Sequence, residues 1–215
     1  YARDMLAGVE YDTVYHEHLC YFSVTPLARL AEAVGLRVVD VEHVPVHGGS
    51  IRVWLARAAE HGGTARALMA QEEHSLASRA VWAHFANRVA QSRESLHAFF
   101  AQQQAAGRRV VGYGAPAKAN TLLNYCGIGT DLLEFTVDRN PYKQGTYMPG
   151  VRIPVLPTEA LAERKPDDIL ILPWNLQKEI VEQLSYTAEW GARLVVPIPK
   201  PVVAMVAGYA VGGGQ

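Results

Sequence analysis

Cysteine is scarce in this chain of 215 residues, which contains only Cys20 and Cys126. Two cysteines cannot build a disulfide framework or a cysteine-rich zinc site, and they predict a reducing, cytoplasmic location. An excess of charge of one sign is also lacking, because 20 Lys and Arg stand against 21 Asp and Glu. This balance argues against a protein that binds nucleic acid through a basic surface. No apolar run is long enough to cross a bilayer, so no membrane association is expected.

An initial methionine and a signal-type apolar segment are lacking too, since the chain begins with Tyr1. We therefore expect this chain to be a section of a longer polypeptide. What is present is a globular composition, with 49% hydrophobic and 19% charged residues, which can form a sizeable core. Residues 207–215 are rich in glycine and are expected to form a flexible tail.

The pattern of apolar residues divides the chain into two parts. Residues 1–106 predict a small α+β segment with a helix at 25–34, begun by Thr25 and Pro26, and a hairpin of strands 36–44 and 50–57. Long helices follow over 64–106. Apolar residues recur there from Trp82 to Phe100 at helical spacing, which predicts a buried stripe.

Residues 107–206 alternate strands and helices. The predicted strands are largely apolar and lie at 108–113, 133–138, 168–172 and 193–197. Such strands alternating with helices indicate a parallel sheet that is covered on both faces. We therefore predict an α/β fold, with a Rossmann-like doubly wound parallel sheet in this second part.

The first of these strands leads into a glycine loop at residues 112–118. The loop matches G-x-G-x-x-A, a weaker form of the dinucleotide fingerprint. Gly112, Gly114 and Ala115 allow a phosphate to approach the backbone closely, and the helix that follows offers N–H groups. Lys118 adds a positive charge and Asn120 a hydrogen-bond donor. We predict a phosphate-bearing ligand here, and a purely structural turn is the alternative.

Asp138 ends the next strand, 24 residues after Gly114. A ribose-binding carboxylate of a dinucleotide site is expected near this position. The loop by itself does not distinguish NAD, coenzyme A and a nucleotide-sugar as the ligand. Rossmann methyltransferases usually carry an acidic residue and three closely spaced glycines in their first motif. This loop has neither feature, so it is not predicted to bind S-adenosylmethionine.

The densest chemical segment lies near the start of the chain. Residues 10–21 contain three tyrosines, two histidines and three acidic residues. A histidine can accept a proton near neutral pH, and a tyrosine can donate a hydrogen bond to a developing oxyanion. His18 and Tyr15 could therefore enolise a carbonyl compound. The alternatives are a metal site built on His16 and His18, a polar surface loop, and structural histidines.

A second histidine, His47, lies in a glycine-rich segment at the predicted hairpin turn, where it could reach a ligand. An ordinary turn with an incidental histidine is an equally good interpretation.

Several segments, taken in order, resemble one known family. Residues 15–23 resemble the signature of the sugar C-methyltransferases that act on nucleotide-linked 4-keto-deoxysugars. The similarity runs from about Tyr11 to Pro199. It includes further segments at residues 47–50, 112–121, 137–145, 149–150 and 172–175.

The resemblance implies a protein of three parts: an N-terminal zinc-binding domain, a middle domain that binds S-adenosylmethionine, and a Rossmann-like C-terminal domain that helps to hold the nucleotide-sugar. This chain lacks the cysteine-rich part and the methyl-donor motif, so it looks like the C-terminal domain. The other two domains, with their zinc and S-adenosylmethionine, are then its expected partners. We expect no methyl transfer by the chain on its own.

The family reaction removes a proton from carbon 3, beside the 4-keto group, and then methylates that carbon. The resemblance implies that His18 is the base and that Tyr15 and Glu17 assist it. His16 and His47 are expected substrate contacts, and the glycine loop is expected to face the diphosphate. Asn175 follows a strand at the edge where such sheets bind ligands. An NAD-dependent oxidoreductase and a non-catalytic ligand-binding domain are the alternative functions.

Overall fold

The structure, a computed structural model, describes residues 1–44, 46, 48–57 and 60–204. The expected tail at 207–215 lies outside these residues. The chain forms two compact units, Tyr1–Ala90 and Gln91–Gln215. The division falls within helix α4 (Arg79–Ala105), whereas the sequence predicted a boundary after residue 106. The last turns of α4 explain this, because Leu96 and Phe100 are buried and the Gln103 side chain accepts a hydrogen bond from Arg193.

The first unit contains a helical N-terminal part, a hairpin and two longer helices. Strands β1 and β2 pair antiparallel, with a bulge between Val38 and Asp40. Val24 and Ala28 pack with Val38 and Ala65 in a small core between α2, β1 and α3. The predicted hairpin and helices are thus confirmed. The elements are α1 (Ala2–Gly8), η1 (Tyr11–Thr13), α2 (Val24–Ala33), β1 (Arg37–Val44), β2 (Ser50–Ala56), α3 (Gly63–Ser75) and the start of α4.

The start of α2 differs from the prediction. The helix begins at Val24, so Ser23 and not Thr25 occupies the N-cap position. The Ser23 side chain makes no capping hydrogen bond. Glu72 of α3 caps the helix instead. Its carboxylate accepts hydrogen bonds from Val24 N (2.7 Å), Thr25 N (2.8 Å) and the Thr25 hydroxyl (2.8 Å). A carboxylate at a helix N-terminus satisfies amides that have no partner within the helix.

We expect Glu72→Ala to lower the free energy of unfolding by about 2–3 kcal/mol, because it leaves several buried donors without an acceptor. Glu72 is only 2% exposed. The neighbouring Glu73 is exposed on the same helix, so Glu73→Ala is a matched control. Urea unfolding of both variants measures the difference. Equal stability of the two variants would show that α2 does not depend on this cap.

The second unit is built on one six-stranded sheet. The strand order is β5-β4-β3-β6-β7-β8, and all neighbours are parallel except β7 and β8. The chain therefore reverses its direction of winding between β3 and β6. The elements are β3 (Val110–Tyr113), α5 (Ala117–Cys126), β4 (Thr136–Val137), β5 (Val155–Leu156), α6 (Ala160–Arg164), β6 (Asp168–Ile171), η2 (Trp174–Leu176), α7 (Gln177–Gln183), η3 (Ser185–Trp190), β7 (Arg193–Val196) and β8 (Val202–Ala204).

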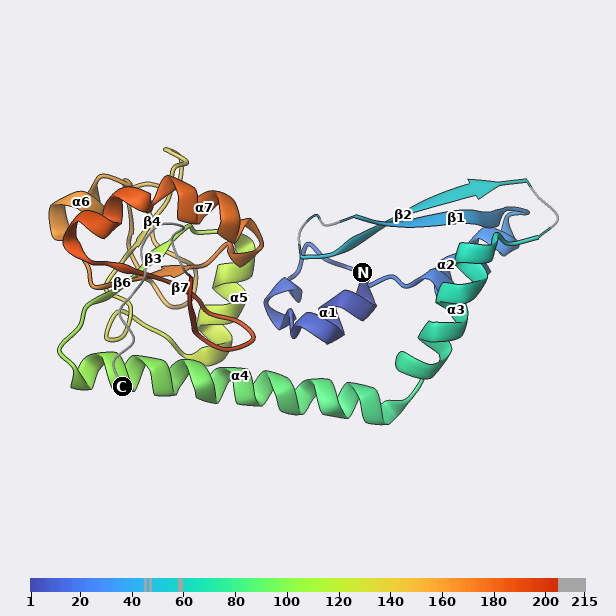
Figure 1. The fold of residues 1–215 in the computed structure, drawn as a ribbon, viewed down its shortest axis with the longest axis horizontal. Coiled ribbons are helices and arrows are strands. Elements are labelled where there is room, and N and C mark those ends of the chain that lie inside the picture. The colour runs from blue at the N-terminus through green and yellow to red at the C-terminus, as the bar shows by residue number, and fades with distance from the viewer. Residues whose placement is uncertain (45, 47, 58–59, 205–215) are drawn as a thin grey trace. The chain divides into compact units, whose positions relative to one another are not determined.

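Helices cover both faces of this sheet, as the apolar strands predicted. Within this unit, α5 and the second half of α4 lie on one side, and α6 and α7 lie on the other (Figure 1). Val111 and Ile169 point to the second side, where they pack against Leu161 of α6 and Ile180 of α7. The doubly wound Rossmann-like fold is confirmed. Its switch point between β3 and β6 is where such sheets bind ligands.

The apolar stripe predicted along α4 is not continuous. Val89, Leu96 and Phe100 are buried, but Trp82 is 41% exposed, and its indole N–H donates to the Leu76 carbonyl. The prediction was wrong at this end, where the helix begins close to the chain turn after α3. In the described part of the chain, no helix is both long and apolar enough to span a membrane.

Candidate functional site

The histidine segment, residues 14–22, connects η1 to α2 in the first unit. The Thr13 hydroxyl donates to the Glu10 carbonyl (2.6 Å) at one end, and Glu72 holds the start of α2 at the other. Between them, His18 N donates to the Tyr15 carbonyl (2.9 Å) and closes a turn. This turn places the side chains of Tyr15 and His18 against each other.

The Tyr15–His18 pair has a defined hydrogen-bond direction. His18 Nδ1 lies 2.8 Å from the Thr13 carbonyl oxygen, and a carbonyl can only accept, so Nδ1 carries the hydrogen. In the neutral imidazole, Nε2 is then the basic atom. It accepts a hydrogen bond from the Tyr15 hydroxyl at 2.8 Å, and the two ring centroids are 4.0 Å apart. The arrangement presents one basic nitrogen beside one hydroxyl donor.

The Tyr15 hydroxyl stays protonated at neutral pH. Burial raises its pKa above 10, and the negative charges of Glu17 and Asp12 raise it further. His18 itself is exposed. The pair can therefore accept a proton on His18 Nε2 and offer a hydrogen bond from Tyr15.

The structure brings Tyr15 and His18 together but leaves the other expected residues apart from them. His16 and Glu17 are exposed, and within the described residues their side chains make no hydrogen bond or ion pair. Glu17 acts on Tyr15 through its charge. His47 lies outside the described residues. Among the described residues, no three His, Cys, Asp or Glu side chains gather as metal ligands.

Sequence reasoning missed two groups at this site. The Thr13 carbonyl fixes the His18 ring, and Tyr21 donates a second hydrogen bond to the same oxygen at 3.2 Å. A backbone carbonyl leaves no signal in a sequence. Tyr21 does leave one, because it lies three residues after His18 in a segment rich in tyrosine.

The glycine loop of the second unit lies where β3 ends. Gly112 N and Gly114 N donate to the carbonyls of Phe135 and Val137, so the loop is held against β4. Gly114 has a φ of 88°, and a Cβ at this position would lie 2.7 Å from Pro173 Cδ. Its lack of a side chain is thus required by the close approach of the segment after β6.

Asp138 lies beside the loop, as its spacing predicted, but its carboxylate is turned toward the loop backbone. Oδ2 accepts a hydrogen bond from Ala115 N (2.7 Å), and Oδ1 accepts one from Asn140 N (2.8 Å). Lys143 Nζ is 3.5 Å from Oδ2 and donates to the Ala115 carbonyl (2.8 Å). An oxygen with negative charge therefore already occupies the position that a phosphate oxygen would take at this amide.

Lys118 and Asn175 meet at the switch point between β3 and β6. Lys118 Nζ donates to Asn175 Oδ1 (2.7 Å) and lies 4.3 Å from the centre of the Trp174 ring. Asn120 is one turn into α5, and its buried Oδ1 has no hydrogen-bond partner among the described residues. The two lysines around the loop suit an anionic ligand. They do not suit S-adenosylmethionine, whose sulfonium is a cation.

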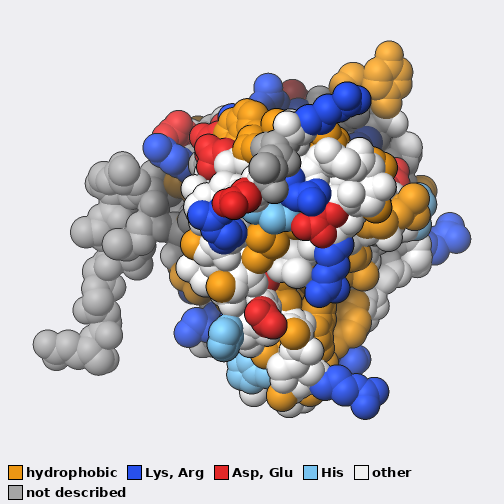
Figure 2. All heavy atoms as spheres, turned by 90° about the vertical axis from the view of Figure 1, so that its right-hand side faces the viewer, with side chains coloured by type: hydrophobic (Ala, Val, Ile, Leu, Met, Phe, Trp, Pro, Cys, Tyr) orange, Lys and Arg blue, Asp and Glu red, His pale blue; other side chains and the backbone are white. Residues whose placement is uncertain are grey.

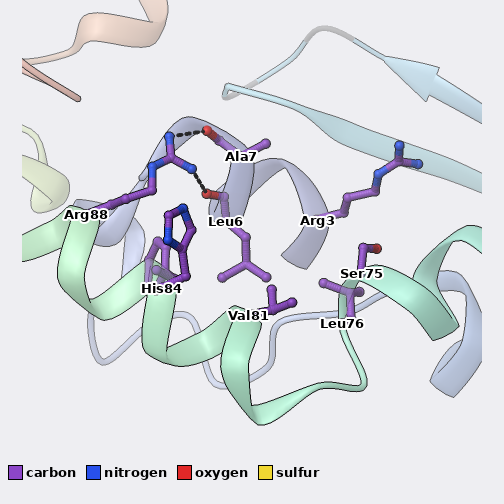
Figure 3. Close-up of a pocket in the computed structure, with 9 residues that line it drawn as sticks. Arg3, Leu6, Ala7, Ser75, Leu76, Val81, His84 and Arg88 are labelled. Carbon is purple, nitrogen blue, oxygen red and sulfur yellow. Dashed lines mark hydrogen bonds between the residues drawn. The ribbon is translucent and has the colours of Figure 1, made fainter.

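A separate cavity of about 240 Å³ lies in the first unit between α1, α3 and α4. Leu6, Leu76 and Val81 make it largely apolar. The Arg88 guanidinium donates to the carbonyls of Leu6 and Ala7, so it caps the end of α1 (Figure 3). None of the expected site residues lines this cavity.

The face in Figure 2 mixes basic, acidic and hydrophobic side chains without a continuous area of one charge. The charges on this face are thus distributed as the balanced composition suggests.

Comparison with known proteins agrees with the family resemblance. The family of C-methyltransferase C-terminal domains matches residues 45–199. C-methyltransferase NovU of Streptomyces niveus is 39% identical over 207 residues, which cover 94% of this chain and 49% of that protein. The chain thus spans about half the length of this curated relative. The family match begins after the histidine segment, whereas the similarity to NovU extends over nearly the whole chain.

Proposed function

Since the chain belongs to the family of C-methyltransferase C-terminal domains, we propose that it binds and deprotonates the substrate of an S-adenosylmethionine-dependent C-methyltransferase. We propose a nucleotide-linked 4-keto-deoxysugar as this substrate. The observation that carries the proposal is the hydrogen-bonded pair of Tyr15 and His18, with His18 Nε2 as its basic atom. The loop lysines do not suit the methyl donor, so we assign that donor to another part of the enzyme.

His18 Nε2 takes the proton from carbon 3 of the sugar. The electrons of that C–H bond move into the ring and place negative charge on the 4-keto oxygen, which makes an enolate. The Tyr15 hydroxyl gives up its bond to Nε2 and donates to this oxygen. Nδ1 keeps its bond to the Thr13 carbonyl, which stabilises the imidazolium that forms. Glu17 contributes a negative charge that raises the pKa of Tyr15 and so helps to keep its hydroxyl protonated as a donor.

The glycine loop holds the diphosphate of the substrate. Its position at the carboxyl ends of the parallel strands and the cation of Lys118 support this assignment. Asn175 keeps Lys118 at the loop. The Asp138 carboxylate must leave Ala115 N when a phosphate oxygen binds there.

An NAD-dependent oxidoreductase is less well supported. In a dinucleotide site the carboxylate after the second strand accepts hydrogen bonds from a ribose. Here Asp138 accepts them from Ala115 N and Asn140 N.

A thermal-shift experiment on this chain tests the ligand class. We expect inorganic pyrophosphate and at least one of UDP, GDP, CDP and thymidine diphosphate to stabilise it. At a concentration of 100 times the Kd, such a ligand stabilises by about 2.7 kcal/mol, a shift of several degrees in Tm. Lys118→Met should abolish most of this shift, whereas Lys178→Met, which changes an exposed lysine of α7, should not. A shift with NADH alone, or with no phosphate compound, would contradict the proposal.

A further inference from the structure

A cavity of about 350 Å³ lies beside the glycine loop in the second unit, and nothing above gives it a role. Three of its residues follow the ends of adjacent parallel strands: Tyr113 at the end of β3, Arg139 after β4 and Thr158 after β5. The edge formed by these strand ends is where open α/β sheets bind ligands. The remaining lining residues come from α7 and the turns after it: Gln183, Leu184 and Tyr186.

A fixed amide organises the polar side of the cavity. Gln183 Nε2 donates to Glu179 (2.6 Å), which leaves Oε1 as the acceptor. Oε1 accepts hydrogen bonds from the Tyr113 hydroxyl (3.1 Å) and from Arg139 Nη1 (3.3 Å). A guanidinium has five N–H donors, and the bond to Gln183 uses one of them. The remaining N–H groups of Arg139 and of the Gln183 amide can therefore donate to the edge of a planar ring, and the Tyr113 hydroxyl oxygen can accept from it.

Tyr186 supplies an aromatic wall. Its ring packs edge-on against Trp190, with centroids 5.8 Å apart, and it remains 37% exposed. The contact with Trp190 holds the ring in one orientation. An exposed aromatic ring of fixed orientation is a suitable surface on which a nucleobase can stack.

The charges around the cavity favour a neutral ring over a phosphate. Burial raises the pKa of both lining tyrosines. At Tyr113 the positive charge of Arg139 lowers the pKa, whereas the negative charges of Asp138 and Glu179 raise it further. At Tyr186 the negative charge of Glu159 raises the pKa further. Three carboxylates thus act on the cavity against one guanidinium. A phosphate is better placed at the loop, where the two cations of Lys118 and Lys143 lie with the one carboxylate of Asp138.

We propose that this cavity holds the nucleoside part of the substrate, with the base stacked on Tyr186 and its edge bonded to Arg139 and Gln183. The proposal rests on the proposed function, in which the glycine loop holds the diphosphate. The chain links the two sites directly, because Tyr113 precedes Gly114 and Arg139 follows Asp138. One nucleotide can therefore lie across both.

Calorimetric titration of the chain with a nucleoside diphosphate and with inorganic pyrophosphate tests the assignment. The nucleotide is whichever of UDP, GDP, CDP and thymidine diphosphate binds most tightly. We expect Arg139→Met and Tyr186→Leu each to weaken nucleotide binding about 10-fold and to change pyrophosphate binding less than 2-fold. Lys118→Met should weaken both ligands. Arg152→Met and Tyr142→Leu are matched controls, because both residues are exposed in the same unit and neither lines the cavity.

The outcomes separate the two proposals. Equal weakening of nucleotide and pyrophosphate by Arg139→Met would make Arg139 a phosphate contact and overturn the nucleoside assignment. Unchanged nucleotide binding in both cavity variants would also overturn it. If the unaltered chain binds neither pyrophosphate nor any of the nucleotides, the proposed function fails at the glycine loop itself.

Discussion

Replacing His18 by asparagine is expected to lower turnover about 10²- to 10⁴-fold in the full-length methyltransferase that we propose contains this chain. General-base catalysis contributes this much, and asparagine cannot accept the proton. Tyr15→Phe should cost less, about 10-fold, because the base remains while the donor to the oxyanion is lost. Single-turnover methylation assays at saturating substrate measure both effects.

The matched control for this experiment is His74→Asn. His74 is also an exposed histidine bonded to a backbone carbonyl, that of Ala70, but it lies on α3 and has no role in the proposed site. Its turnover should equal that of the unaltered enzyme. If His18→Asn retains turnover within threefold, His18 is not the base. Recovery of the lost activity by added imidazole would instead support its role as a base.

Replacing Asp168 by alanine is expected to lower the free energy of unfolding of the second unit by about 3–5 kcal/mol. Asp168 is fully buried at the start of β6 and bonds two arginines. Arg108 Nε lies 2.9 Å from one carboxylate oxygen, and Arg193 Nε lies 2.7 Å from the other. The same carboxylate raises the pKa of Arg193 through its hydrogen bond. Removing it leaves two cations in a partly buried place without their counterion.

Hydrogen exchange of the β6 amides, measured during urea unfolding, reports on the stability of this unit separately from that of the first unit. Glu163→Gln alters an exposed acid on α6 and should leave stability within about 0.5 kcal/mol. A loss below 1 kcal/mol in the Asp168 variant would show that the arginines find other partners.

The sequence was informative where an element is long and its pattern is regular. The helix at 25–34, the long helices over 64–106 and the hairpin were predicted from the spacing of their apolar residues, and the main parallel strands from short, largely apolar runs. Helix α1 was not predicted. β5 and β8 were missed because they have only two and three residues and prolines border them, Pro154 and Pro157 at β5 and Pro201 at β8. Trp82 was wrongly assigned to the buried apolar stripe of α4, because helical spacing does not indicate where no other element packs against a helix.

At the candidate site, too, the sequence predicted features that follow from a local pattern and missed contacts between distant segments. The G-x-G-x-x-A pattern located the loop, and strand topology explains why Lys118 meets Asn175, 57 residues later. The sequence did not show that Gly114 is required by Pro173, or that the Asp138 carboxylate bonds Ala115 N. Both depend on contacts between segments that no local pattern specifies. The capping of α2 by Glu72 is a third contact of this kind.

Deuterium exchange at carbon 3 of a nucleotide-linked 4-keto-deoxysugar tests the central claim most directly. The full-length enzyme is incubated with this substrate in heavy water without the methyl donor, and exchange is followed by proton NMR. We predict that the unaltered enzyme exchanges this proton and that the His18→Asn variant does not. Deprotonation requires His18 Nε2 but does not require the methyl donor. Exchange at the same rate in both proteins would contradict the assignment of His18 as the base.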